Sequence, residues 1–158
     1  MTSATAQNPT ARAYRSFSAL TGSLASVFLL AIRLYWGWQF AQTGWGKLHH
    51  LDKVTSFFTS LGIPAPGFNA VFVALLEFIG GIALALGFGS RFFAFLLAGD
   101  MFVAYLTAGR GNLLSIFSDP GKFYGDDAFT FLFASLIVMI FGPGKLALDE
   151  FLHRVSKF

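Results

Sequence analysis

Long apolar stretches separated by short polar connections run along most of this chain. Four stretches are continuously apolar, at about residues 23–45, 68–89, 92–109 and 127–142. A helix that crosses about 30 Å of hydrocarbon needs roughly 20 mostly apolar residues. The four runs therefore predict an all-α membrane protein, a four-transmembrane-helix bundle.

The connection between the first two apolar stretches has a pattern of its own. Val54, Phe57, Phe58 and Leu61 recur at helical spacing, with Ser and Thr between them. This pattern is typical of a short amphipathic helix on the membrane surface. We thus divide the chain into a disordered polar tail (1–20), a four-helix transmembrane domain (21–149) and a short cytoplasmic tail (150–158).

Composition agrees with this division and narrows the chemistry. The chain is 55% hydrophobic and 12% charged, whereas a soluble domain carries about a quarter charged residues, so the lipid bilayer is the expected surrounding. Its net charge of +3 comes from scattered basic residues, which argues against nucleic-acid binding. The absence of cysteine excludes disulfides, thiol redox pairs and cysteine-held iron–sulfur clusters in this chain. Adjacent histidines, His49 and His50, point in different directions on a helix, and we predict no metal site.

Basic residues in the short loops predict the orientation. With four spans both termini share a side, which would carry six basic residues: Arg12, Arg15, Arg91, Lys145, Arg154 and Lys157. The opposite side would carry four: Lys47, Lys53, Arg110 and Lys122. The excess favours both termini in the cytoplasm.

Three charged residues fall near the middle of predicted spans: Arg33, Glu77 and Asp100. A charge at the bilayer centre costs about 2.5–3.5 kcal/mol, so these side chains should face inward, with Arg33 as the counter-ion of both acids. One cation and two carboxylates leave an excess negative charge, so Glu77 or Asp100 is expected to hold and exchange a proton. The alternative stays open that the charges only fix helix packing.

Helical spacing places further side chains on the same inner face. Trp36, Phe40 and Lys47 follow Arg33 at steps of three and four. The predicted ligand-binding set is Arg33, Trp36, Phe40, Lys47, Glu77 and Asp100. For the tryptophan the alternative is anchoring at the membrane interface.

The order and spacing of several motifs resemble the DoxX family. They comprise Arg33-x-x-x-Gly37-x-x-Phe40, Gly44-x-x-Lys47-Leu48, Glu77-x-x-Gly80-Gly81 with Gly87 and Arg91, and Gly142-Pro143-Gly144-Lys145 followed by Leu148-Asp149. The resemblance covers residues 31–149. It implies a four-helix protein of a bacterial or archaeal cytoplasmic membrane, similar to membrane subunits of a thiosulfate:quinone oxidoreductase, with other membrane or soluble redox subunits as partners.

The functional hypothesis is therefore an integral membrane subunit of a quinone-linked oxidoreductase, with quinone as the cofactor and none bound covalently. Electrons would come from a partner subunit or from a reductant that meets the quinone directly. Two alternatives remain: a non-enzymatic subunit that anchors or stabilises a larger membrane complex, and a small-solute carrier, which would require a homo-oligomer.

Overall fold

The computed structural model describes residues 9–155, without the side chains of Pro9, Ser23 and Arg154. In chain order the helices are α1 (Pro9–His49), α2 (Leu51–Ser60), α3 (Pro66–Leu86), α4 (Ser90–Thr107), α5 (Arg110–Leu113), α6 (Pro120–Tyr124), α7 (Asp127–Phe141) and α8 (Leu148–Val155). The described part contains no strand, so the all-α prediction is confirmed. Within it, α1, α3 and α4 are long and apolar enough to cross a membrane, whereas α7 has only 15 residues.

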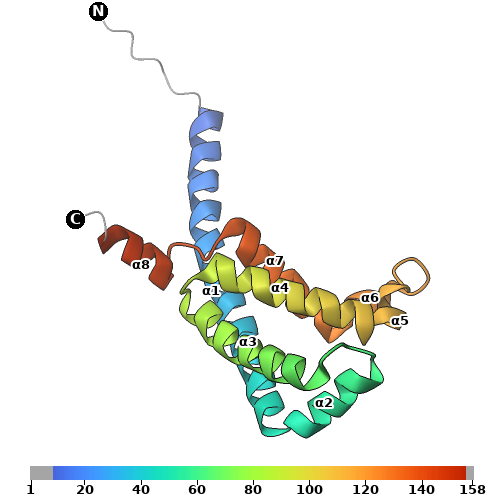
Figure 1. Cartoon of the computed structure of the whole chain (residues 1–158). Coiled ribbons are helices and arrows are strands. Elements are labelled where there is room, and N and C mark those ends of the chain that lie inside the picture. Colours follow the sequence, from blue (N-terminus) through green and yellow to red (C-terminus); the bar gives the residue numbers. More distant parts are fainter. Residues whose placement is uncertain (1–8, 156–158) are drawn as a thin grey trace, which may run out of the picture.

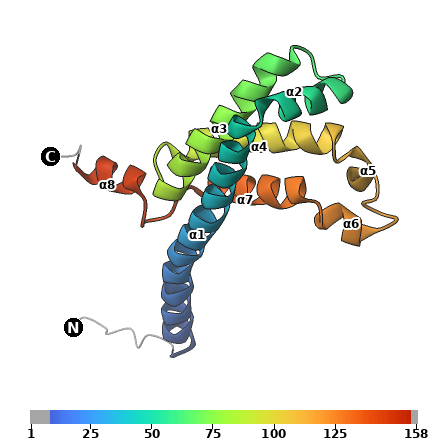
Figure 2. The ribbon, with the colours of Figure 1, turned by 90° about the horizontal axis from the view of Figure 1, so that it is seen from below.

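The helices form two pairs, α1 with α3 and α4 with α7, and α3 joins the pairs by packing against α4. Both views show α4 lying beside α7 (Figures 1 and 2). The core lies where the pairs meet, around Phe40, Leu84, Leu97 and Val138, none of which is exposed.

Glycines set the distance between α1 and α3. A Cβ atom on Gly37 would lie 2.7 Å from the backbone nitrogen of Ala85, and one on Gly81 would lie 2.5 Å from that of Ala41. A Cβ on Gly44 would likewise collide with the backbone of Phe78. The backbones therefore touch, as small residues allow in membrane helix pairs. This contact fixes which residues of α1 face which residues of α3.

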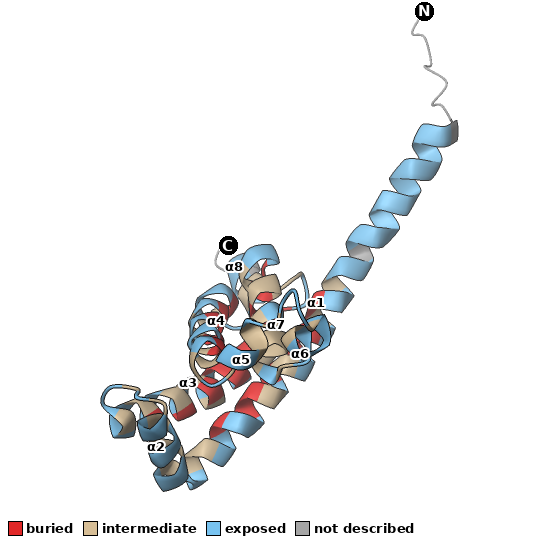
Figure 3. Ribbon diagram, turned by 90° about the vertical axis from the view of Figure 1, so that its right-hand side faces the viewer, coloured by how far each residue is buried: buried red, intermediate tan, exposed pale blue. Residues whose placement is uncertain are grey.

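The first helix differs from the prediction. Residues 1–8 lie outside the described residues, but residues 9–20, expected as a disordered tail, are helical. Proline is tolerated in the first turn of a helix, and no glycine or further proline interrupts the segment before Gly22. In Figure 3 this half of α1 extends away from the other helices and is exposed on all sides. At the other end, residues 150–155 of the predicted C-terminal tail belong to α8.

Candidate functional site

The structure separates the predicted cluster of three buried charges into two sites. Arg33 and Lys47 both lie on the inner side of α1, fourteen residues apart, which corresponds to about 21 Å along the helix. The two acids gather near Lys47, not near Arg33. The prediction that Arg33 is their counter-ion is therefore wrong, and the reason is the register of α1 against α3.

The first site joins Lys47, Glu77 and Asp100 from α1, α3 and α4. The Lys47 Nζ atom lies 2.6 Å from Oε1 of Glu77, and the Glu77 side chain is only 2% exposed. Asp100, at the middle of α4, lies close enough to Glu77 and Lys47 to interact with both electrostatically. Lysine reaches this position because its four-carbon stem extends from the last turns of α1 toward the middle of α3.

Two oxygen atoms of this cluster have no hydrogen-bond donor. They are Oε2 of Glu77 and Oδ2 of Asp100, and both are buried. With one ammonium group between two carboxyl groups, the cluster carries an excess negative charge when all three side chains are ionised. Buried oxygens without donors are costly, so the arrangement favours any group that can supply a hydrogen to them.

A cavity of about 380 Å³ adjoins the cluster. The charged side chains of Lys47 and Asp100 line it together with the polar side chains of Asn69 and Thr107, while most of its walls are apolar. The walls come from α2, α3 and α4 and include Phe57, Phe58, Val73, Met101 and Ala104. A small-ligand site typically has a volume of about 300–1,000 Å³, mostly apolar walls and a few polar groups. The cavity fits that description.

The apolar face of α2 is the part of this site that the sequence did not reveal. Its spacing predicted a helix on the membrane surface, but Val54, Phe57, Phe58 and Leu61 line the cavity. Packing of α2 against α3 brings them there. The signal present in the sequence was the helical spacing, which identifies an apolar face without identifying what that face covers.

The second site lies around Arg33, at the C-terminal end of α3. Arg33 is fully buried, and its Nη2 atom donates a hydrogen bond of 2.6 Å to the carbonyl oxygen of Leu146. A Cβ atom on Gly87 would collide with the Arg33 guanidinium group, so only glycine leaves room for it. Arg33 thus ties the chain after α7 to the end of α3.

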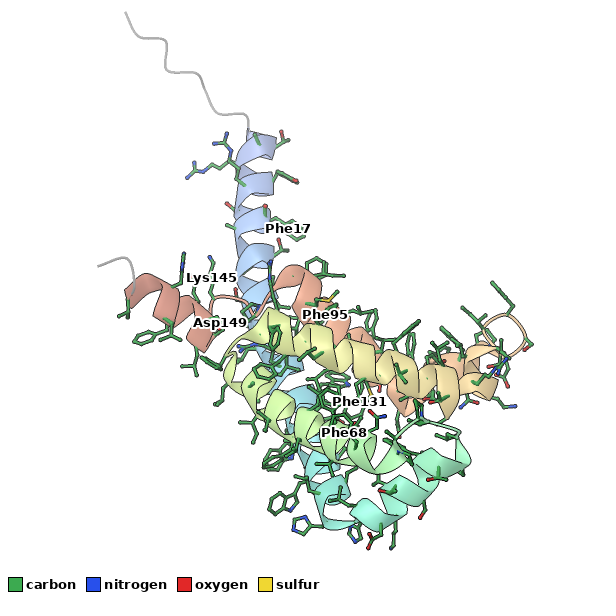
Figure 4. The ribbon with its side chains drawn as sticks, viewed as in Figure 1. Phe17, Phe68, Phe95, Phe131, Lys145 and Asp149 are labelled. Carbon is green, nitrogen blue, oxygen red and sulfur yellow. The ribbon has the colours of Figure 1, made fainter. Side chains whose placement is uncertain are left out.

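Asp149 completes this second site. Its carboxylate accepts hydrogen bonds from the backbone nitrogens of Gly89 (2.7 Å) and Ser90 (2.9 Å), at the beginning of α4. Its own backbone nitrogen donates to the carbonyl oxygen of Gly87 at 2.9 Å. Lys145 and Asp149 appear together at this end of the bundle in Figure 4. These contacts hold the connection between α7 and α8 in place, beside an open groove of about 810 Å³ whose lining includes Ser90, Lys145 and Asp149.

Trp36 and Phe40, also predicted to bind a ligand, lie outside the cavity. Phe40 is fully buried, and its ring packs edge-on against Phe131 with 4.6 Å between the centroids. Trp36 packs against the same core cluster. Of the six predicted ligand-binding residues, the structure brings together Lys47, Glu77 and Asp100.

Comparison with known proteins adds two relatives and a family. The sequence profile of the DoxX family matches residues 28–110. The "Inner membrane protein YqjF" of Escherichia coli (strain K12) is 29% identical over 139 residues, which cover 83% of this chain and 96% of that protein. The "Putative oxidoreductase CatD" of Bacillus subtilis (strain 168) is 28% identical over 128 residues, 81% of this chain and 89% of that protein. No solved structure matches this chain at comparable significance.

Proposed function

This chain belongs to the DoxX family of membrane proteins, and from that premise we propose that it is the membrane subunit of a quinone-linked oxidoreductase. The observation that carries the proposal is the 380 Å³ cavity, with apolar walls and with Lys47 and Asp100 in its polar part. The related CatD protein, whose name describes an oxidoreductase, supports the redox assignment.

The residues of the cavity suit a quinone headgroup. A quinone takes up two electrons and two protons when it is reduced to the quinol. Lys47 carries ammonium hydrogens suited to a carbonyl oxygen, and hydrogen bonds from charged donors are about twice as strong as neutral ones. Phe57, Phe58 and Met101 provide apolar surface for the ring beside the charged groups.

The acids supply the place for a proton. A single proton held between Glu77 and Asp100 would make one carboxyl group the donor and the other the acceptor, and so satisfy the two buried oxygens that lack a donor. The cluster of Lys47, Glu77 and Asp100 would then carry no net charge. Both carboxyl groups belong to the proposed proton-exchanging pair, with Asp100 lining the cavity and Glu77 behind it. Electrons arrive from a partner subunit or from a reductant of the thiosulfate class that meets the quinone directly.

We further propose that α7 is the fourth span and that both termini lie in the cytoplasm. α7 packs along α4 and has Ala134, Ser135 and Val138 buried, as expected of a bundle member. Because Lys47 is engaged with Glu77, it no longer counts as a loop residue. The basic residues then number six on the side of the termini against three on the other, counted over the whole sequence.

The test is the quinone content of the purified protein. We expect the chain, purified in mild detergent, to release near-stoichiometric quinone on organic extraction, measured by mass spectrometry. Lys47→Met removes a charged hydrogen-bond donor worth about 1.5–3 kcal/mol, so the affinity for quinone should fall roughly tenfold or more. Asp100→Asn removes the proton-exchanging carboxyl group that lines the cavity. Asp52→Asn is the matched control, since Asp52 is exposed on α2 and lies outside the cavity.

Two results would contradict the proposal. One is a protein that releases no quinone and binds none when a short-chain quinone is added back. The other is quinone binding that is unchanged in both Lys47→Met and Asp100→Asn, because the cavity would then not be the binding site.

A further inference from the structure

An exposed stripe runs along the outer side of α1. Its residues alternate at steps of three and four over more than four heptads: Tyr14, Phe17, Thr21, Leu24, Phe28, Ala31, Tyr35, Trp38, Gln42 and Trp45. All ten are exposed, whereas Arg33, Gly37, Phe40 and Gly44, on the opposite side of the helix, are buried against the bundle. A strict 3–4 alternation is the repeat of a coiled-coil seam, where two helices wind around each other. We call these ten residues the α1 seam.

The length of α1 indicates that the seam has a partner. α1 contains 41 residues and is therefore about 61 Å long, about twice the thickness of the hydrocarbon layer. Every described side chain from residue 10 to residue 22 is exposed. Phe17, labelled in Figure 4, lies on this uncovered part of the helix and is 65% exposed. An isolated helical segment of about 13 residues, the length of this uncovered part, is only marginally stable in water, and a second helix along the seam would stabilise it.

Gln42 indicates what that partner is. It lies on the exposed side of α1, whereas its neighbours Ala41 and Gly44 are buried against α3 on the other side of the helix. Among the described residues none forms a hydrogen bond with its amide, which faces the surroundings of a membrane span. An amide group both donates and accepts, so it can pair with its own copy across a two-fold axis.

The surface around Gln42 is shaped to receive a side chain. A groove of about 410 Å³ lies between α1 and α3, lined by Trp38, Gln42, Trp45, Phe78 and Ile82. In a coiled coil each seam residue inserts into such a hole on the facing helix. A polar residue at one seam position fixes the register of the pair.

We propose that two copies of this chain form a parallel dimer through the α1 seam, with Gln42 paired with Gln42 of the second copy. Copies inserted in the same orientation lie parallel, so each seam residue meets its own counterpart. The seam continues beyond the span, and the projecting halves of α1 form a two-stranded coiled coil outside the bundle. This inference does not depend on the proposed redox function, because the cavity lies on the other side of α1.

Single-cysteine variants test the seam directly, since the natural chain has no cysteine. We expect Leu24→Cys and Ala31→Cys, both on the seam, to form disulfide-linked dimers when native membranes are treated with copper phenanthroline. Ala19→Cys and Thr43→Cys are the matched controls, because both residues are exposed on α1 but lie off the seam. Equal cross-linking at all four positions, no dimer at Leu24→Cys and Ala31→Cys, or a product containing a different protein would each overturn the proposal.

A second measurement tests the register. Gln42→Leu removes the paired amides and should weaken dimerisation in detergent about threefold to tenfold, by sedimentation equilibrium. Thr43→Val, which removes a polar group beside the seam, should leave the dissociation constant unchanged. If Gln42→Leu has no effect or strengthens the dimer, the pairing of Gln42 is wrong.

Discussion

The ion pair between Lys47 and Glu77 makes a stability prediction that can be worked from its geometry. The two charged atoms lie 2.6 Å apart, and the Lys47 side chain is 30% exposed while that of Glu77 is 2% exposed. Removing one partner of a fully buried pair costs about 3–5 kcal/mol, whereas an exposed pair contributes about 0.2–1 kcal/mol. Because one partner is buried and the other is partly exposed, Lys47→Met should lower the free energy of unfolding by about 2–3 kcal/mol.

The double variant separates the interaction energy of the ion pair from the cost of leaving one buried charge without a partner. In Lys47→Met the carboxylate of Glu77 stays buried beside Asp100 with no cation, whereas Lys47→Met/Glu77→Gln removes both charges. We therefore expect the double variant to be more stable than the sum of the single effects predicts, by about 1–2 kcal/mol. Lys53→Met, an exposed lysine on α2, is the control and should change stability by no more than about 0.5 kcal/mol.

The assay is reversible unfolding in mixed micelles, titrated with sodium dodecyl sulfate and followed by tryptophan fluorescence. The reasoning would be refuted if the effects of Lys47→Met and Glu77→Gln added to within about 0.5 kcal/mol. The two side chains would then not be energetically coupled, and Lys47 and Glu77 would not form an ion pair at the polar part of the cavity.

Two further substitutions probe the rest of the framework. Arg33→Met removes the hydrogen bond to the Leu146 carbonyl and should lower the free energy of unfolding by about 1–3 kcal/mol. It should leave the quinone content unchanged, because Lys47 lies about 21 Å away along α1. A loss of quinone without a loss of stability would contradict this. Gly81→Leu should lower stability by at least about 1–3 kcal/mol in the same titration, since any Cβ there meets the α1 backbone, whereas Gly99→Leu, at an open position, should be tolerated.

The sequence was sufficient for three of the four predicted spans and for the two acids. Each predicted span depends on length and hydropathy, which the bilayer imposes directly on the chain. Glu77 and Asp100 lie at the middle of two helices joined by a short turn, so their proximity follows from the hairpin itself. The hydropathy pattern and the hairpin topology were together enough to predict that Glu77 and Asp100 lie close to each other.

The cation of the site could not be predicted, because it depends on how far α1 slides along α3. Hydropathy identifies a span within α1, but it does not define how that span is placed along α3 or which residues face the bundle. The register is set by backbone contacts at Gly37, Gly44 and Gly81, which place Arg33 beside Gly87 and leave Lys47 near Glu77. To take the place of Lys47, Arg33 would have to move by about 15 Å along the helix axis, the rise of the ten residues between Gly87 and Glu77.

The proposed dimer interface and the cavity lie on opposite faces of α1. Lys47 lies on the inner face, where the cavity is closed by α2 and α4, and the α1 seam lies on the opposite face. A dimer formed through the seam would therefore hold its two cavities on its outer sides, away from the two-fold axis. Each cavity would then remain accessible to a lipid-dissolved quinone and to a redox partner, so dimerisation and quinone binding should be separable. Gln42→Leu should weaken the dimer and leave the quinone content unchanged. Lys47→Met should release quinone and leave the dimer intact.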